Sequence, residues 1–564
     1  MRRFSAWLFV VLVSGWLLWS LATVPPAAKT LDLPGPAVPP QVRGAYHIHS
    51  TASDGTGTVA DIARSARRAG LDFIIVTDHA DGTRVLPPPR YEAGVLTLEA
   101  MEISTDDGHY AALGLDTPPY RLGGDGRDVA EDVMRLGGFG IVAHPDSAKP
   151  DLRWRDWNMP IGGYEWFNAD SQWRDESRLA LVPVLLHYLL RKPEAVASLF
   201  DRPADALAQW DRLAARGHVV GMAAADAHAR LGLRGRSDPY VDALYVRLPS
   251  YESVFRAFSL RVDLDEPFEG DALRDGRRLL NALRLGRVTT TFEALASPAR
   301  VVFEGEAAGE RVGPGGDLSH VTPITFRVRS NAPAGATIIL MRNGESVHES
   351  ATPEVEWLTD RAGAFRAEIR LPDALGQPPI PWVVTNPIYV AVPPGPPRPT
   401  PLAAARSSTV IPRGTWNIER DPASQGVIHL LSPEGAPIFA SFSYRLAPRP
   451  AASPYVAAVT HDVGPLFEAD RLAFQASATK PMRLSVQLRS QAGGVERRWR
   501  RSVYLDETAR EVTIAFAEMR GVAEARGMPL RIRDMSALLF VVDTVNTAPG
   551  DQGAVTLVNL RAEK

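Results

Sequence analysis

The chain has 564 residues, of which 45% are hydrophobic and 23% are charged, and its formal net charge is −3. This length exceeds what one hydrophobic core usually serves, so about three or four domains are expected. The small net charge gives no general attraction to nucleic acid, which argues against long nucleic acid as a partner. The chain has no cysteine, which excludes disulfides, thiolate metal sites and cysteine nucleophiles.

The first 24 residues have the pattern of a signal peptide or of a membrane anchor. Arg2 and Arg3 precede an apolar run over 4–24, and Pro25-Pro26 ends any helix there. The run is long enough for a bilayer, and the leading charges predict a cytoplasmic N-terminus with the remainder translocated. A small-x-small pattern at 20–22 also offers a cleavage signal. Both alternatives predict an extracytoplasmic protein, either anchored by its N-terminal helix or secreted.

After a Pro-rich linker over 25–41, predicted strands and helices alternate across residues 42–298. Strands are predicted over 73–76, 95–103, 110–115, 139–143, 164–167 and 219–224, and helices over 61–70, 129–136, 181–190 and 204–216. Strands alternating with helices indicate a parallel sheet, and about seven such units indicate a closed barrel whose strand ends converge on one face. Residues 251–287 look helical and polar, so we expect them to cover the flank of this barrel.

Beyond residue 298 the pattern becomes all-β. Short strand candidates and the hairpin signal Asn343-Gly344 predict a small Ig-like β-sandwich over 299–392. A semi-rigid linker follows over 393–406, with six prolines in its first nine residues. Longer alternating runs over 407–564 predict a jelly-roll β-sandwich.

Nine side chains of metal-ligating type stand where these strands are predicted to end or begin. Six are histidines, half of the twelve in the chain, and three are carboxylates: His47, His49, Asp54, His79, Glu102, His109, His144, Asp226 and His228. One histidine after a strand is usually a capping or loop residue. Nine candidates in one barrel favour a polynuclear metal site, and imidazole with carboxylate suits Zn, Mn or Fe.

Two pairs of these candidates are spaced two residues apart. On a strand, such side chains project to the same face, so His47 and His49 can share one ion at about 2.1 Å. Asp226 and His228 repeat the spacing and can serve two neighbouring ions. Glu102 closes its predicted strand and can bridge two ions through its two oxygens.

These segments resemble the signature segments of the PHP (polymerase and histidinol phosphatase) family of metal-dependent phosphoesterases. The signature segments occur in order between residues 42 and 296, and His47 to Gly55 reproduces the pattern His-x-His-Ser-x-x-Ser-Asp-Gly. That pattern is typical of a branch that includes nucleotide and nucleic-acid phosphoesterases. The resemblance implies a distorted seven-stranded β/α barrel.

The same resemblance implies two or three divalent transition-metal ions and assigns their ligands by position. It distributes the nine candidates among three ions: His47, His49, Glu102 and Asp226 on the first, Glu102, His109 and His144 on the second, and Asp54, His79 and His228 on the third. It also implies that Asp78 orients a ligand histidine. Glu165 and Asn168 match a family segment without an assigned role.

The implied chemistry is hydrolysis of phosphate esters by a metal-activated water. The residues that this implies as catalytic are Asp54, His79, Glu102 and Asp226. Asp54 or His79, beside the third ion, would assist the leaving oxygen. Lys149 follows His144-Pro145 and Arg230 follows His228, so both are candidates to bind a non-bridging phosphate oxygen.

The last domain resembles galactose-binding-like and carbohydrate-binding jelly rolls, through segments such as 540–543 and 553–555. Trp416, Tyr444 and Trp499 in this domain could form a sugar-binding platform, although core packing explains such aromatic residues more often. A carbohydrate ligand is therefore a candidate partner of this domain.

The substrate expected from the whole pattern is a phosphorylated small molecule or a short oligonucleotide. Two alternatives stay open: a non-catalytic, metal-containing surface protein that binds or senses, and an exonuclease on short oligonucleotides. The intact ligand set argues against the first, because loss of hydrolysis usually accompanies loss of ligands. The absence of a basic stripe argues against long nucleic acid in the second.

Overall fold

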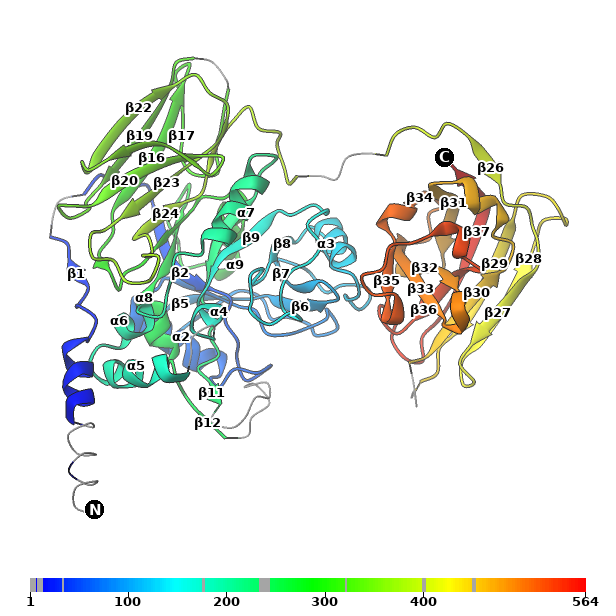
Figure 1. Cartoon of the computed structure of the whole chain (residues 1–564), viewed down its shortest axis with the longest axis horizontal. Helices are drawn as coiled ribbons and strands as arrows, with labels where there is room; N and C mark the ends of the chain where they lie inside the picture. Colours follow the sequence, from blue (N-terminus) through cyan, green and yellow to red (C-terminus); the bar gives the residue numbers. More distant parts are fainter. Residues whose placement is uncertain are drawn as a thin grey trace. The chain divides into compact units, whose positions relative to one another are not determined.

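The computed structural model describes most of the chain, and its residues form two compact units (Figure 1). The described residues are 7, 14–32, 35–174, 178–232, 244–319, 322–397, 402–448 and 453–564. The first unit contains residues 1–80, 86–116 and 133–398, and the second contains 81–85, 117–132 and 399–564. All nine candidate ligands belong to the first unit.

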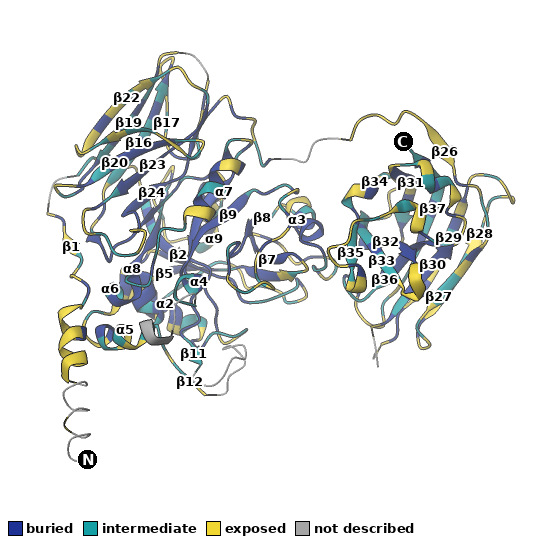
Figure 2. Cartoon of the chain, in the orientation of Figure 1, coloured by how far each residue is buried: buried dark blue, intermediate teal, exposed yellow. Residues whose placement is uncertain are grey.

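Two sheets of the first unit provide the strands around the candidate ligands. In one sheet, three parallel neighbours are β2 (Gln41–Tyr46), β3 (Phe73–Val76) and β5 (Val95–Glu99). The other sheet has the order β10-β9-β8-β7-β6, with β6 (Met101–Thr105), β7 (Gly108–Leu113), β8 (Phe139–Val142), β9 (Gly163–Asn168) and β10 (Val220–Ala224). These strands are largely buried (Figure 2), which explains their continuous apolar runs.

The two sheets are joined at two places. β5 continues into β6 through Ala100, so one stretch of chain pairs with β3 on one side and with β7 on the other. Beyond β2 and β10, Ile48 bridges to Ala227, and His49 N–H donates to the Ala227 carbonyl at 3.0 Å. Backbone pairing therefore runs from β10 through β8 and β5 to β2 and returns to β10, which gathers the strand ends around one interior.

Two parts of this unit differ from the sequence prediction. The expected purely parallel sheet is wrong for β7, which is antiparallel to both β6 and β8. A tight turn joins β6 to β7, with Gly108 at φ 116° and Thr105 Oγ1 donating to the Gly108 carbonyl at 2.7 Å, so no helix intervenes. The second difference is in residues 251–287, which are only partly helical: β13 (Ser259–Asp263) lies between two helices and pairs with β2.

The predicted helices form, with small changes at their ends. After the helical residues 14–22, the described helices of the first unit are α2 (Val59–Ala69), α4 (Ala169–Arg174), α5 (Arg178–Leu190), α6 (Lys192–Ala197), α7 (Ala204–Ala214), α8 (Tyr251–Ala257) and α9 (Ala272–Arg284), and α3 (Gly126–Arg135) is divided between the units. α2 shows why its ends fall where they do. Thr58 and Asp61 form a reciprocal capping box at its start, and Gly70 ends it in the left-handed conformation.

Residues 301–390 form two layers of strands. One is a four-stranded sheet made of β17 (Glu310–Val312), β16 (Val301–Ala307), β19 (Ile324–Ser330) and β22 (Glu354–Thr359). The other contains β18 (Asp317–Leu318), β20 (Thr337–Arg342), β21 (Glu345–Ser350), β23 (Gly363–Arg370), β24 (Val383–Thr385) and β25 (Ile388–Val390). β24 pairs with β14 (Val288–Thr291), which pairs with β13, so this layer is continuous with the sheet of β2, β3, β5 and β4 (Arg90–Glu92).

In the second unit, two six-stranded sheets enclose one large core. One sheet contains β26 (Ser408–Val410), β28 (Gln425–Leu430), β29 (Phe439–Arg445), β31 (Arg471–Ala478), β34 (Arg510–Ala515) and β37 (Gln552–Glu563). The other contains β27 (Trp416–Arg420), β30 (Tyr455–Thr460), β32 (Met482–Ser490), β33 (Arg497–Leu505), β35 (Arg520–Val522) and β36 (Ala537–Asp543). Trp416, Tyr444 and Trp499 are buried in this core, so the sugar-platform interpretation of these three residues is wrong.

Of the apolar run predicted as an anchor, residues 4–6 and 8–13 lie outside the described residues. Residues 14–22 are helical. Within the described ranges, the structure has no helix that is both long enough and apolar enough to cross a membrane. The linker that follows lies along the first unit, because β1 (Lys29–Thr30) pairs with β15 (Ala296–Ser297).

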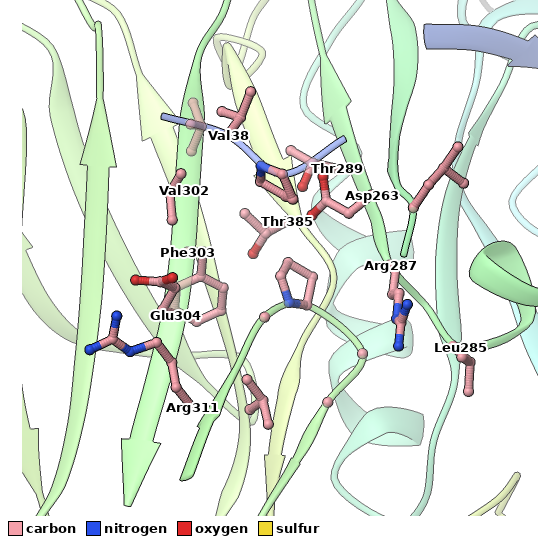
Figure 3. Close-up of a pocket in the computed structure, with 18 of the residues that line it drawn as sticks. Val38, Asp263, Leu285, Arg287, Thr289, Val302, Phe303, Glu304, Arg311 and Thr385 are labelled. Carbon is pink, nitrogen blue, oxygen red and sulfur yellow. The ribbon is translucent and has the colours of Figure 1, made fainter. Parts of the chain in front are cut away.

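A cleft of about 730 Å³ lies in the first unit, between β13–β14 and β16–β17 (Figure 3). Its lining includes Asp263, Arg287, Glu304 and Arg311 and none of the nine candidate ligands. Its basic groups have acidic partners: Arg287 pairs with Asp265, and Arg311 pairs with Glu306. The metal-type chemistry of the chain is therefore elsewhere, at the strand ends.

Candidate metal centre

Glu102 lies in the middle of the candidate site and is 1% exposed. Its Oε2 is 3.4 Å from His47 Nε2, 3.3 Å from His49 Nε2 and 3.2 Å from His79 Nδ1. These three imidazoles come from the ends of β2 and β3. One carboxylate oxygen thus faces three ring nitrogens at once.

The other oxygen of Glu102 faces a second group. Its Oε1 is 2.8 Å from His109 Nδ1 and 2.8 Å from His144 Nε2. His109 is the second residue of β7, and His144 follows β8. The two oxygens therefore face separate sets of histidines, which is the arrangement that a carboxylate bridging two ions requires.

Asp226, after β10, completes the first group. Its Oδ1 is 3.4 Å from His47 Nε2 and 3.3 Å from His49 Nε2. Two oxygens and two nitrogens from three segments of the chain thus surround one point. This is the set that the sequence resemblance assigned to a first ion.

A third group lies beside His49. Asp54 Oδ2 is 3.5 Å from His79 Nε2 and 3.4 Å from His228 Nε2. The rings of His49 and His228 stack with centroids 4.1 Å apart. The structure therefore places all nine sequence-predicted candidates near one another, and their assignment to three separate ions stays a prediction.

The spacing around His47, His49 and His79 suits ions better than direct hydrogen bonds, whereas His109 and His144 lie at hydrogen-bond distance from Glu102, 2.8 Å each. Four sets have ligand atoms within 4.8 Å of one another: His47/Glu102/His144, His47/His49/Asp226, His49/Asp54/His228 and His49/His79/Glu102. Two ligands about 2.05 Å from one tetrahedral ion would lie about 3.3 Å apart, whereas a charge-assisted hydrogen bond is about 2.7–2.9 Å long. The distances of 3.2–3.5 Å around His47, His49 and His79 match the first value.

Orphaned ring nitrogens point to the same conclusion. His47 Nε2, His49 Nε2 and His79 Nδ1 are buried and have no hydrogen-bond partner. A buried polar atom without a partner costs about 1–3 kcal/mol, so several in one place call for an explanation. The residues present fit divalent ions of the Zn, Mn or Fe type, for which neutral imidazole and carboxylate are ordinary ligands.

The electrostatics of the site favour positive charge. Burial by itself lowers the pKa of His49, but contacts with Asp226 and Glu102 outweigh burial and raise that pKa to about 10. Against the same effect of burial, Glu102 raises the pKa of His144 to about 9. Burial raises the pKa of the Asp226 carboxyl, yet His47 and other histidines hold it well below its ordinary value. Protons or metal ions can supply the charge that these carboxylates stabilise.

The backbone is strained at three of the candidate ligands. His47, His144 and Asp226 have φ of 63°, 26° and 42°. A non-glycine residue in this region costs roughly 1–3 kcal/mol and persists where the surroundings impose it. The expected strand geometry of His47 and His49 is accordingly wrong, because β2 ends at Tyr46 and His47 turns the chain. Both rings nevertheless reach the same two carboxylates.

Glu165 and Asn168, on β9, hold the ligands in place. Glu165 Oε1 lies 2.6 Å from His47 Nδ1, and its Oε2 accepts from the backbone N–H of His144 at 2.7 Å. A proton on His47 Nδ1 leaves Nε2 with its lone pair toward the interior of the site, as metal binding requires. Asn168 Nδ2 donates to Glu165 and to Asp226, both at 3.1 Å. The role that the sequence left unassigned is therefore to position ligands.

Asp78 fixes the turn that carries Asp54. It accepts from Ser50 N–H at 2.7 Å, Ser50 Oγ at 2.6 Å and Ser53 Oγ at 2.6 Å. Ser53 Oγ is 3.4 Å from His49 Nδ1. Asp78 thus acts on a ligand histidine through a serine, a more indirect route than the sequence suggested.

Tyr251, in α8, was not identified from the sequence. Its hydroxyl lies 2.8 Å from the His49 carbonyl and 3.2 Å from the His228 carbonyl, and it accepts from the backbone N–H groups of Thr56 and Gly57 at 3.2 Å each. One phenol therefore fixes the backbone of two candidate ligands. No motif or spacing marks it, because the contact to His49 spans 202 residues.

Arg230 and Lys149, the two residues predicted to bind substrate, lie at different distances from the candidate ligands, as their contacts show. Arg230 donates from Nη1 to the Asp54 carbonyl at 3.4 Å, and its guanidinium lies 4.5 Å from the Tyr245 ring centre. Lys149 lies five residues after His144, in a turn where its backbone N–H donates to Ser147 Oγ at 3.3 Å. Arg230 thus adjoins the third group, and the contacts of Lys149 place it only near His144 in the chain.

No model of a known protein family matches this chain, and no similar curated protein was found. Solved structures give similarities of two kinds. A two-domain protein from Bacteroides vulgatus that contains a predicted PHP-like metal-dependent phosphoesterase is 15% identical, over 64% of this chain and 99% of that chain, with a TM-score of 0.29.

The second kind comprises carbohydrate-binding modules. The family 11 module of a cellulosomal cellulase from Clostridium thermocellum is 14% identical over 28% of this chain and 95% of that chain, with a TM-score of 0.23. A family 30 carbohydrate-binding module is 10% identical over 28% of this chain and 95% of that chain, with a TM-score of 0.21. These similarities are to a PHP-like protein and to carbohydrate-binding β-sandwich modules.

Proposed function

We propose that this protein is a metal-dependent hydrolase of phosphate esters. The observation that carries the proposal is the position of Glu102, whose two oxygens face five histidines in two groups within 2.8–3.4 Å. Such a carboxylate is suited to hold two ions side by side. We infer two or three divalent ions per chain, of the Zn, Mn or Fe type, in a distorted (β/α)7 barrel over 42–298.

The bound ions would supply Lewis acidity and a water of lowered pKa, which suits attack on phosphorus. The chain itself supplies the framework: Glu102 and Asp226 bring negative charge to the ions, and Glu165 orients His47. The side chains of His79 and Asp54 are 34% and 17% exposed, whereas those of His47, His49 and Glu102 are at most 1% exposed. Substrate therefore approaches on the side of His79 and Asp54.

That exposed side also carries the groups suited to the leaving oxygen and to the phosphate. His79, whose side chain is 34% exposed, is suited to give a proton to the leaving oxygen, and Asp54 lies 3.5 Å from its ring. Arg230, anchored at the Asp54 carbonyl, is placed to donate to a non-bridging phosphate oxygen. Lys149 is the second candidate for this role.

We further propose that the protein acts outside the cytoplasm, anchored by residues 1–24 or released after their cleavage. The basic residues before the apolar run support this topology. We also propose that residues 407–564 form a jelly-roll module with a carbohydrate ligand, which would place the hydrolase near a glycan surface. The buried Trp416, Tyr444 and Trp499 would not contribute to that ligand site.

The test is a hydrolysis assay with the purified full chain in detergent. The chain is loaded with Zn or Mn and offered a phosphomonoester, a phosphodiester and a short oligonucleotide. We expect turnover of at least one class, its loss on treatment with a chelator, and its return when metal is restored. Metal-loaded protein that hydrolyses none of the three would contradict the proposal and favour a binding or sensing role.

A further inference from the structure

α5 presents an apolar face that no part of the described protein covers. Val182, Leu185, Leu189 and Leu190 are 45%, 44%, 76% and 56% exposed. The spacings of three and four residues place Val182, Leu185 and Leu189 along one side of the helix, and Leu190 lies at the edge of that side. No charged residue occurs between 179 and 190. We call these four residues the α5 apolar face.

The opposite side of α5 is held by specific contacts. Tyr188 is buried, and its hydroxyl lies 3.0 Å from Ser250 Oγ and 2.9 Å from Ser253 Oγ, at the start of α8. His187 is buried as well. The apolar face is therefore the outer side of a helix that is firmly docked, rather than a part of a frayed segment.

The N-terminal helix, residues 14–22, lies directly beside α5 (Figure 1). His187 Nε2 is 2.8 Å from the carbonyl oxygen of Ser20, in the last turn of that helix. After the helix, Arg191 Nη1 donates to the Pro25 carbonyl at 2.6 Å, and Ala28 N–H donates to Glu194 Oε1 at 3.2 Å. The segment that leaves the apolar run is thus fixed to α5 and α6.

The N-terminal helix is itself apolar and exposed (Figure 2). Leu18, Trp19 and Leu21 are 68%, 55% and 51% exposed. If residues 4–24 cross a bilayer, Ser20 lies four residues before the end of the span. At 1.5 Å per residue, four residues of helix cover only about 6 Å. α5 is bonded to that turn, so it lies at the depth where the acyl chains meet the headgroups.

We propose that the α5 apolar face is a membrane-contact surface that lies in the bilayer beside the N-terminal helix. An apolar helix that is exposed along one side and followed by basic residues is suited to this depth, and Arg191 and Lys192 follow directly after α5. The proposal rests on the membrane insertion of the N-terminal segment proposed above. It goes further, because it makes the first unit a body seated on the membrane instead of one carried on a loose tether.

The absence of cysteine from the chain permits a direct test. Leu185→Cys and Leu189→Cys place single thiols on the α5 apolar face, and Leu273→Cys is the matched control, an exposed leucine of α9 with 51% exposure. Each full-length variant is labelled with a nitroxide and reconstituted into vesicles of phosphatidylcholine and phosphatidylglycerol. Exposed positions tolerate such changes, so the variants should fold.

The readout is collision of each nitroxide with oxygen, which dissolves in the bilayer, and with a water-soluble nickel chelate. We expect the oxygen-to-nickel accessibility ratio at 185 and 189 to exceed that at 273 at least fivefold. Equal nickel accessibility at the three positions would overturn the proposal. Protection of 185 and 189 from both reagents would overturn it too, because a protein surface would then cover the face.

Flotation of the same vesicles separates this inference from the proposals before it. Protein that does not float with the vesicles would overturn both the anchoring and the membrane contact of α5. Protein that floats, with positions 185 and 189 as accessible to the nickel chelate as position 273, would overturn the membrane contact of α5 alone. The labels report no hydrolysis, so failure of the phosphoesterase proposal would leave this result unchanged.

Discussion

Two buried charged clusters lie in the first unit, and they are built differently. Around Arg366, which is 1% exposed, every distance is that of a good hydrogen bond: 2.7 and 2.8 Å to the two oxygens of Asp211 and 2.8 Å to Glu368. Around Glu102, several contacts are 3.2–3.4 Å, and buried ring nitrogens stay without partners.

This difference separates a cluster that stabilises the fold from a cluster that is suited to bind cations. The Arg366 cluster joins α7 to β23 and satisfies its own groups, so it needs nothing further. The Glu102 cluster brings carboxylate oxygens and ring nitrogens to face one another, an arrangement that costs free energy unless protons or metal ions lie between them. Counting charged residues would not distinguish the two, whereas distances and orphaned atoms do.

The largest effect should come from Glu102→Gln. The substitution keeps the size of the side chain but removes the charge that offsets two ions, so hydrolysis should fall by roughly 10²-fold or more. Steady-state turnover of metal-loaded protein measures this. Glu293→Gln is the matched control, because Glu293 is a buried carboxylate that pairs with Arg43 and Arg261 away from the site. Near-wild-type turnover in Glu102→Gln, with bound metal unchanged, would contradict the claim that the charge of Glu102 offsets two ions.

Arg366→Met should show the opposite pattern. Removing one partner of a buried ion pair leaves uncompensated charge, so the free energy of unfolding should fall by about 3–5 kcal/mol. The folded fraction should keep its metal content and its turnover, because Arg366 contacts no candidate ligand in the described structure. Urea unfolding and elemental analysis of the folded fraction test this. Loss of metal from the folded fraction would make the Arg366 cluster part of the site.

Tyr251→Phe should weaken the site without dismantling it. It removes the hydroxyl that holds the backbone of His49 and His228, so affinity for the most weakly bound ion should fall roughly 10-fold. Metal titration measures this effect. Tyr188→Phe is the control, since it removes a hydroxyl that contacts the same helix, α8, through Ser250 and Ser253. Equal loss of metal affinity in both variants would show that only the stability of α8 matters.

The last expected effect concerns protons. Carboxylates raise the pKa of His49 to about 10 and that of His144 to about 9, so both rings carry protons near pH 7 when no metal is bound. Ions must displace these protons, so metal affinity should fall as pH is lowered from 8 to 6. Calorimetric titration in two buffers of different ionisation enthalpy should show net proton release. Uptake without proton release would contradict these directions.

The sequence predicted which candidate ligands the fold brings together better than it predicted the residues that support them. His47, His79, Glu102, His144 and Asp226 could be found because each is tied to a short apolar strand, and the strand ends converge. Tyr251 could not be found, because its contact with His49 depends on how α8 packs, and α8 lies about 200 positions further along the chain. The contact of Glu165 with His47 is equally a product of packing, although its sequence segment was recognisable.

In the fold, local signals explain both the successes and the errors. α2 could be predicted from its cap residues, which act within a few positions of each other. β13 could not, because its five residues between two helices carry no turn signal of their own, and it is a strand only through pairing with β2 and β14. The antiparallel direction of β7 follows from a four-residue turn at Gly108, which a search for alternating strands and helices overlooks.

The most direct test of the account is the number of metal ions held by the wild-type chain. Purified protein is stripped with a chelator, reconstituted with Zn or Mn, passed through a desalting column and analysed for metal per chain. The geometry around Glu102 predicts two or three ions per chain. The Glu102→Gln variant should hold at least one ion fewer than the wild-type chain. A wild-type chain that retains no ion after reconstitution would contradict the claim that these nine residues form a metal centre.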